Sequence, residues 1–332
     1  MRSRATALAA LLISLLLGLT ACGSGGSADE PAASGGASGE GGTWPRTITH
    51  AMGTTEIKKQ PVRVLALDNS YAEATLALQA QLVGFTQYRG LGETLPDYLG
   101  DARTAYAKDA KSVGTLAEPN LEQIAALQPD LIISAKVRHE KIYPQLSKIA
   151  PTVMSETTGA QWKDNMTMFG KALGKEDLAA QILGDYEKAA AEVGKAVNAK
   201  AGNPTISVVR FLDGPTRLYQ KASFTGIILE DAGLARPPSQ DVDDFAAEIS
   251  EEKIKDADAD KIFVTTYDAE DDKGTKTREQ FAANPLWAPL APKVVQVDDG
   301  TWMTSVSVQG AYVVLADLAK TFGVDAPENP LA

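Results

Sequence analysis

Residues 177–197, DLAAQILGDYEKAAAEVGKAV, decide the fold of this chain. Apolar side chains recur along the segment at helical spacing, at Leu178, Ile182, Tyr186, Ala189 and Val193. The surrounding stretch from about 161 to 201 carries no strand signal. We therefore predict a single long helix over 161–201.

Short runs rich in valine and isoleucine lie on both sides of this helix. They are VRVLAL at 62–67, LVGFTQ at 82–87, DLIIS at 130–134, TISVVRFL at 205–212, KIFVTTY at 261–267 and KVVQVD at 293–298. Strands alternating with helical patterns are typical of βαβ units, which predicts the α/β class with parallel-rich sheets. The chain beyond Trp44 is longer than one core usually supports. We predict an N-terminal lobe at 44–160 and a C-terminal lobe at 202–332, joined by the helix.

The N-terminus has the pattern of a lipoprotein signal. Arg2 and Arg4 precede a short apolar run at 7–19, and Leu19-Thr-Ala-Cys22 closes it. We predict a signal peptide at 1–21 and a flexible Gly/Ser linker at 22–43 that starts with the lipidated Cys22. The other interpretation of Cys22, the only cysteine, is a small buried residue. Several acyl chains would hold the protein at the outer face of the cell membrane.

Charge and ligand types exclude several functions. The formal net charge is −11, and loss of Arg2 and Arg4 with the signal makes it −13, which argues against a nucleic-acid partner. His50 and His139 are the only histidines, too few for a dedicated transition-metal site. Acidic runs at 243–245, 268–272 and 298–299 lack calcium-loop spacing, so we interpret them as solvated surface rather than a hard-metal cage. No cofactor is expected.

A short pattern recurs in the two halves. Glu122-Gln-Ile followed by Asp130-Leu-Ile is repeated 130 positions later as Glu252-Lys-Ile followed by Asp260-Lys-Ile. Each copy predicts an N-cap residue, Asn120 or Ser250, then a short helix with an acidic first turn, then a strand. Helix capping explains either glutamate alone. The matched offset favours a pair of docking points for a two-subunit partner.

Several motifs together resemble one family. They are Arg46-Thr-Ile-Thr-His50-Ala-Met-Gly-Thr, Glu118-Pro-Asn-Leu-Glu122-Gln-Ile, Pro129-Asp-Leu-Ile-Ile, Leu146-Ser-Lys-Ile-Ala-Pro151-Thr-Val and Trp302 before the last helix. The chain is similar to iron-siderophore binding lipoproteins of ABC importers, the class III periplasmic binding proteins of the FecB, FepB and FhuD type.

This resemblance covers essentially the whole mature domain. It implies two Rossmann-like lobes joined by one rigid long helix, with a ferric siderophore in the shallow cleft between them. It also implies that Glu122 and Glu252 meet arginines of the permease dimer and that the receptor is a monomer.

Two arginines are candidates for binding such a ligand, because ligands of open α/β sheets collect beyond the carboxyl ends of the strands. Arg210 lies inside an apolar strand, where a guanidinium is costly unless it is paired or faces a cleft, so it either contacts ligand or forms an internal salt bridge. Arg138 follows the strand that ends near Ser134, and it either contacts ligand or belongs to a charged helix start.

Further candidates are aromatic or lie near strand ends, and each could be core or site. They are Tyr88, Arg89, Tyr219, Phe224, Trp302 and Met303, with Trp162 and Tyr267 as weaker candidates.

The resemblance points to a hydroxamate siderophore. Some hydroxamate binders carry an arginine where this chain has Leu116, so Arg138 or Arg210 would have to replace it. The sequence assembles too few basic residues for a highly charged catecholate. The alternatives are haem, a corrinoid or ferric citrate, and His139 or Tyr219 could supply a haem axial ligand.

Enzyme signals are weak, and we predict that the protein is not an enzyme. Ser250-Glu-Glu-Lys253 fits the Ser-x-x-Lys pattern of penicillin-recognising enzymes but lacks the companion motifs. Gly-x-Ser-x-Gly is absent. Gly90-Leu-Gly92 lacks the third glycine of a dinucleotide loop and is interpreted as a turn.

Overall fold

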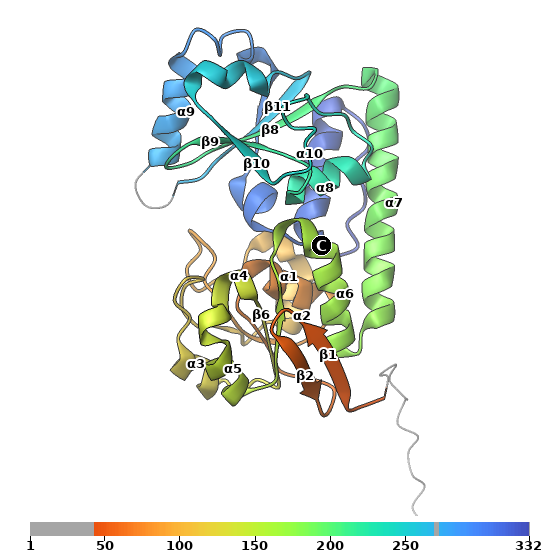
Figure 1. Ribbon diagram of the computed structural model, residues 1–332. Coiled ribbons are helices and arrows are strands. Elements are labelled where there is room, and N and C mark those ends of the chain that lie inside the picture. The colour runs from red at the N-terminus through yellow and green to blue at the C-terminus, as the bar shows by residue number, and fades with distance from the viewer. Residues whose placement is uncertain (1–42, 269–271, 332) are drawn as a thin grey trace, which may run out of the picture. The chain divides into compact units, whose positions relative to one another are not determined.

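The structure is a computed structural model that describes residues 43–268 and 272–331 (Figure 1). The predicted signal peptide, Cys22 and most of the linker lie outside the described residues. Within the described ranges, no helix combines the length and the apolar character needed to span a bilayer.

The first lobe is built on a parallel five-stranded sheet. Its strand order is β5 (Lys111–Ser112), β4 (Leu82–Phe85), β3 (Val64–Ala66), β6 (Leu131–Ala135) and β7 (Thr152–Ser155). The connecting helices are α1 (Asn69–Ala77), α2 (Gly100–Tyr106), α3 (Leu121–Ala126), α4 (Lys136–His139) and α5 (Tyr143–Ile149). An antiparallel hairpin, β1 (Arg46–His50) and β2 (Gly53–Ile57), precedes the sheet.

The second lobe has a mixed sheet with the same parallel centre. Its order is β10 (Ala246–Ile249), β9 (Thr216–Tyr219), β8 (Ile206–Phe211), β11 (Lys261–Thr266) and β12 (Val294–Gln296). β8, β11 and β12 are parallel, whereas β9 and β10 pair antiparallel. Its helices are α8 (Phe224–Asp231), α9 (Lys273–Ala283) and α10 (Val308–Phe322). β6 and β11, the strands of the repeated pattern, hold the same fourth place in their sheets.

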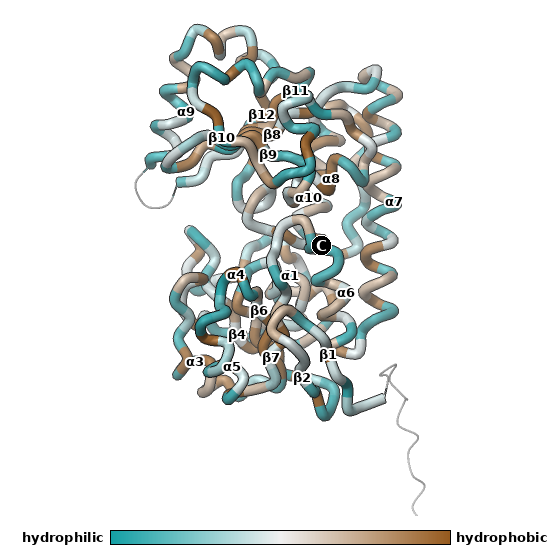
Figure 2. Tube along the Cα trace, in the orientation of Figure 1, coloured by the Kyte–Doolittle hydropathy of each residue, from teal (hydrophilic) through white to brown (hydrophobic). Residues whose placement is uncertain are grey.

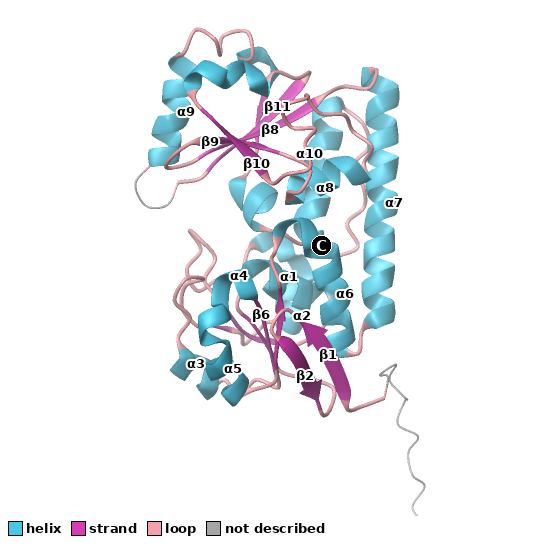
Figure 3. Ribbon diagram, in the orientation of Figure 1, coloured by secondary structure: helices cyan, strands magenta, loops and turns pink. Residues whose placement is uncertain are grey.

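All six predicted strands are present, and the predicted α/β class with two lobes joined by a long helix is confirmed (Figure 3). The predicted single helix over 161–201 is wrong in extent. The stretch forms α6 (Trp162–Leu173) and α7 (Glu176–Ala201), because Gly174 takes a left-handed conformation with φ +69° and ends α6. Only α7 is the connector.

Apolar side chains on both faces of each sheet are covered by helices, as parallel sheets require. Ile132 and Leu65 pack in a cluster with Ile124 and Leu146 from the α3 and α5 side. The opposite face joins a large cluster that takes residues from both lobes and from α7 and α10. Figure 2 shows brown, hydrophobic segments on the strands and alternating colours along α7, whose Ile182, Tyr186 and Val193 are buried.

Candidate functional site

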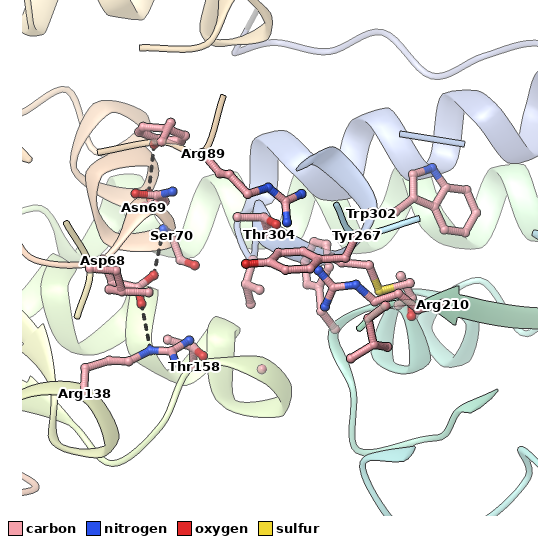
Figure 4. A pocket seen from close by; sticks show the side chains of 18 of the residues that line it. Asp68, Asn69, Ser70, Arg89, Arg138, Thr158, Arg210, Tyr267, Trp302 and Thr304 are labelled. Carbon is pink, nitrogen blue, oxygen red and sulfur yellow. Dashed lines mark hydrogen bonds and ion pairs between the residues drawn. The ribbon is translucent and has the colours of Figure 1, made fainter. Parts of the chain in front are cut away.

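One cavity of about 710 Å³ is lined by residues of both lobes (Figure 4). Asp68 lies two residues after β3, Arg89 follows β4 and Arg138 follows β6. From the second lobe, Arg210 lies in β8 and Tyr267 follows β11. These are carboxyl ends of parallel strands, where ligands of open α/β sheets bind.

The structure brings the sequence candidates to this single cavity. The eight main candidates line it: Tyr88, Arg89, Arg138, Arg210, Tyr219, Phe224, Trp302 and Met303. The weaker candidate Tyr267 lines it too. Trp162 does not line it. Its buried ring packs edge-on against Tyr186 and Phe224.

Arg210 forms an internal ion pair and also borders the cavity. Its Nε and Nη2 atoms donate to the two carboxylate oxygens of Asp299, both at 2.7 Å, and Nη1 donates to the Tyr219 hydroxyl at 3.2 Å. Burial acts to lower the pKa of Arg210, but the hydrogen bonds and charges of Asp299 and Tyr219 outweigh it, and the pKa is raised. The guanidinium therefore stays charged at the cavity wall.

Arg89 reaches the same carboxylate from the other lobe. Its Nη2 lies 3.1 Å from Asp299 Oδ2. Its guanidinium carbon lies 3.6 Å from the centre of the Tyr267 ring, and that of Arg210 lies 4.9 Å from the same centre. Both cations therefore lie within cation–π range of one tyrosine.

Arg138 belongs to the short helix α4, as the helix-start interpretation predicts, and it also lines the cavity. Its Nε lies 3.4 Å from Asp68 Oδ2, and its side chain is 41% exposed. Asp68 is buried and its other oxygen accepts from the Ser70 backbone N–H, which caps α1 (Figure 4). The carboxylate that holds Arg138 is thus fixed by the start of a helix.

Arg217 is a fourth cavity arginine that sequence reasoning missed. It lies on β9 directly opposite Arg210 of β8, and its Nη2 is 3.2 Å from Glu248. Opposite residues of paired strands share one face of a sheet. A weak strand pattern is present in TRLY at 216–219, where Arg217 and Tyr219 are two residues apart and so share one face. The strand is short and follows a Gly-Pro turn, and it was not recognised.

Trp302 borders the cavity, but its ring is part of the core. The predicted loop is a π-helical turn, Gly300–Thr304, and the Trp302 side chain is fully buried. The indole stacks on Phe263 with centroids 4.7 Å apart, and Nε1 donates to Asp317 at 2.8 Å. Figure 4 shows the ring directed away from Arg138. Of the two interpretations of Trp302, core or site, the contacts of its ring favour core.

Asp299 corrects the expectation of a solvated acidic loop at 298–299. The carboxylate is buried and binds two arginines, since a charge removed from water needs such partners. Among the described residues, no cluster of three or more His, Cys, Asp or Glu side chains is placed to hold a metal ion.

His139 is buried beside the cavity with both ring nitrogens engaged. Nδ1 lies 2.7 Å from Ser134 Oγ, and Nε2 lies 2.7 Å from the Leu116 carbonyl oxygen. Burial lowers the pKa of His139, despite the opposing effect of the Leu116 hydrogen bond. Leu116, the position of the missing arginine, lines the cavity.

Comparison with known proteins identifies the family. Residues 64–292 match the periplasmic binding protein family. The chain belongs to this family.

A probable siderophore-binding lipoprotein of Bacillus subtilis, YfiY, is 39% identical and aligns over 83% of this chain and 87% of its own length. The Fe(3+)-citrate-binding protein YfmC of the same organism is 29% identical over 83% of this chain and 85% of its own. The crystal structure of Staphylococcus aureus SirA complexed with staphyloferrin B has a TM-score of 0.75 and 33% identity, covering 85% of this chain and all of that one.

Periplasmic binding proteins of this kind bind substrates and are not enzymes, which confirms the predicted lack of catalysis. Gly90 and Gly92 have φ of +73° and +58° in a turn closed by a bridge between Tyr88 and Gly92. Ser250 precedes a 3₁₀ helix, Glu251–Ala257, at the surface.

The two glutamates of the repeated pattern are exposed near helix starts. Asn120 caps α3 through hydrogen bonds to the backbone N–H groups of Glu122 and Gln123, as predicted. Ser250 also occupies an N-cap position, but its side chain makes no cap hydrogen bond and the helix is 3₁₀. Glu122 and Glu252 therefore lie in first turns and are exposed.

Proposed function

We propose that this chain is the lipid-anchored receptor of an ABC importer and captures an anionic ferric chelate outside the cell membrane. The observation that carries this proposal is the set of four guanidiniums around one cavity between the lobes, from Arg89, Arg138, Arg210 and Arg217. The names of the relatives, for siderophores and for Fe(3+)-citrate, support the same ligand class.

The charge around the cavity favours a negatively charged chelate. Asp68 faces Arg138 and Glu248 faces Arg217, whereas Asp299 is shared by Arg89 and Arg210. Among the described residues, these four arginines and their three carboxylate partners together carry one net positive charge. Guanidiniums bind carboxylate oxygens in a bidentate manner, so a hydroxycarboxylate chelate such as ferric citrate fits this wall. The basic cluster is larger than the sequence alone suggested.

The hydroxamate expected from the resemblance becomes the second candidate, favoured by the apolar Leu116 and Phe224 in the cavity wall. A neutral trihydroxamate would use these side chains more than the guanidiniums. Haem is disfavoured, because both nitrogens of His139 already have partners and the Tyr219 hydroxyl accepts from Arg210.

In this proposal iron reaches the protein already chelated, and the residues bind the organic shell. Acylated Cys22 would hold the receptor, a monomer, at the outer face of the membrane. Glu122 and Glu252 would dock on the permease dimer.

Binding of a chelate panel tests the ligand class. Purified protein is titrated with ferric citrate, a neutral ferric trihydroxamate, a ferric tricatecholate and haemin, and complexes are detected by native mass spectrometry and quenching of tryptophan fluorescence. We expect a one-to-one complex with the hydroxycarboxylate. Arg210→Gln should weaken it by about tenfold or more, since a positive charge at the cavity wall is lost.

Arg103→Gln is the matched control, because Arg103 pairs with exposed Asp97 outside the cavity. It should leave affinity unchanged. Tighter binding of the trihydroxamate than of the citrate complex would overturn the hydroxycarboxylate assignment. A shifted Soret band with haemin would overturn the siderophore assignment.

A further inference from the structure

Asp299 binds Arg210 in the bidentate manner in which a ligand carboxylate could bind it. Its two oxygens occupy the fork of Arg210 at 2.7 Å each, and Oδ2 also lies 3.1 Å from Arg89. The side chain is only 5% exposed, so it is fixed rather than a mobile surface acid. It does not line the cavity itself but holds the two arginines that do.

The contact joins the two lobes. Arg89 follows β4 of the first lobe, while Arg210, Tyr267 and Asp299 belong to the second. Arg89 lies against the Tyr267 ring, which limits where its guanidinium can go (Figure 4). Asp299 and Tyr267 therefore hold two neighbouring cations, one from each lobe, in one geometry.

Two guanidiniums share one carboxylate, so this cluster carries one net positive charge. Without Asp299 the same cluster would carry two, and without Arg89 it would carry none. A charge a few ångströms from a partly enclosed ligand changes affinity strongly, because the effective dielectric there is well below that of water.

We propose that Asp299 is the charge-selecting residue of the cavity: it cancels one of the two central arginine charges and thereby sets how negative a bound chelate can be. It positions Arg89 and Arg210 and does not itself contact iron. This inference rests on the proposed function and adds to it the residue that determines specificity.

The test compares two variants whose effects have opposite signs, with ferric citrate as the probe. Asp299→Asn retains an oxygen acceptor but removes the charge, and it should tighten ferric citrate binding by about tenfold at low ionic strength. Arg89→Gln should weaken it by about tenfold, since the Arg210 and Asp299 charges then cancel. Both differences should shrink as salt is added, because screening acts on the net charge.

The controls come from one exposed ion pair, Lys293 with Asp258, whose Nζ and Oδ1 lie 2.6 Å apart. These residues precede β12 and β11, at the edge of the sheet opposite the cavity. Asp258→Asn and Lys293→Gln make the same changes in total charge, and we expect both to change affinity by less than about threefold.

The outcomes separate the inference from the function. Weaker binding by Asp299→Asn with an unaltered salt dependence would mean that Asp299 only supports the fold, which overturns the inference. Should Asp299→Asn fail to fold, Arg89→Gln still tests the inference. A ferric citrate affinity of Arg89→Gln equal to that of wild type, or a loss of affinity independent of salt, would overturn the inference. Wild-type protein that binds no ferric chelate would overturn the proposed function itself, and the inference with it.

Discussion

Glu73 is a buried carboxylate that ties the two lobes together at the level of single residues. It lies on α1 and accepts hydrogen bonds from the hydroxyls of Ser305 and Ser307 in the second lobe. Tyr98 and Tyr88 donate to it from the first lobe, at 2.7 and 3.2 Å. Burial raises the pKa of Glu73 above its ordinary value of 4.5, and the hydroxyl bonds oppose only part of this effect.

A raised pKa gives this carboxyl a defined pH signature. The folded protein binds the Glu73 proton more tightly than the unfolded chain, so its contribution to stability is full below about pH 4.5 and is lost as pH rises through the folded pKa. We expect wild type to gain free energy of unfolding relative to Glu73→Gln as pH is lowered from about 8 to about 5. Urea unfolding at both pH values measures the difference.

The exposed Glu192 of α7 supplies the comparison. The stability of Glu192→Gln relative to wild type should change less over the same pH range than that of Glu73→Gln, since its carboxylate faces water. A difference in stability between wild type and Glu73→Gln that stays constant with pH would contradict the raised pKa of Glu73.

Single residues also show how far the sequence could predict the site. Arg89, Arg138 and Arg210 were identifiable because they lie in or after recognisable strands, where ligands of α/β sheets collect. Asp299 was not, because an acidic loop gives no local sign that two arginines from distant segments will cover it. Trp302 gave no local sign of its burial either, because its partners Phe263 and Asp317 lie in other segments of the chain.

At the scale of elements, α7 approaches α8 more closely than ordinary side chains allow. A Cβ added at Gly194 would lie 1.6 Å from the carbonyl oxygen of Ala232, the residue that ends α8. The helices can pack this way only because Gly194 has no side chain.

Two glycines of the same helix should therefore respond in opposite ways to alanine. Gly194→Ala should lower the free energy of unfolding by more than about 2 kcal/mol, because backbone must move to relieve the clash. Gly184 has no neighbouring atom within 4 Å of an added Cβ. Gly184→Ala should raise stability by about 0.5–1 kcal/mol, from helix propensity alone. Thermal and urea unfolding of both variants check the pair, and equal losses would contradict the close approach.

The elements found and missed follow the strength of their patterns. Six apolar runs were long enough to be recognised as strands. The strands β1, β2, β5, β7, β9 and β10 were not among those runs. β9 and β10 are short and mixed in polarity, TRLY and AAEI, and their antiparallel pairing has no signal in an alternation of strands and helices. The division between α6 and α7 depends on one glycine, which a helical pattern tolerates.

At the scale of the whole molecule, the proposed docking glutamates should separate binding from transport. Glu122 and Glu252 lie outside the cavity, in the first turns of helices that precede β6 and β11. We expect the double variant Glu122→Ala with Glu252→Ala to bind ferric chelate as wild type does and to abolish uptake by cells. Transport of radioactive iron and titration of the purified protein measure the two properties.

Glu118→Ala with Glu251→Ala provides a double variant of equal charge at neighbouring exposed positions. It should retain uptake. Normal transport by the Glu122 and Glu252 variant would refute their role.

Helix α10 closes the second lobe in sequence, yet it packs against α7 and α1 as well as α8. Its Leu315 and Leu318 belong to the same apolar cluster as Leu82 and Phe85 of the first sheet. Neither lobe is therefore an exchangeable module, because separating the lobes would expose this shared apolar cluster to water. A hybrid receptor that takes its first lobe from one ancestor would have to take α10 from the same ancestor, or replace the apolar residues at which α10 meets that lobe.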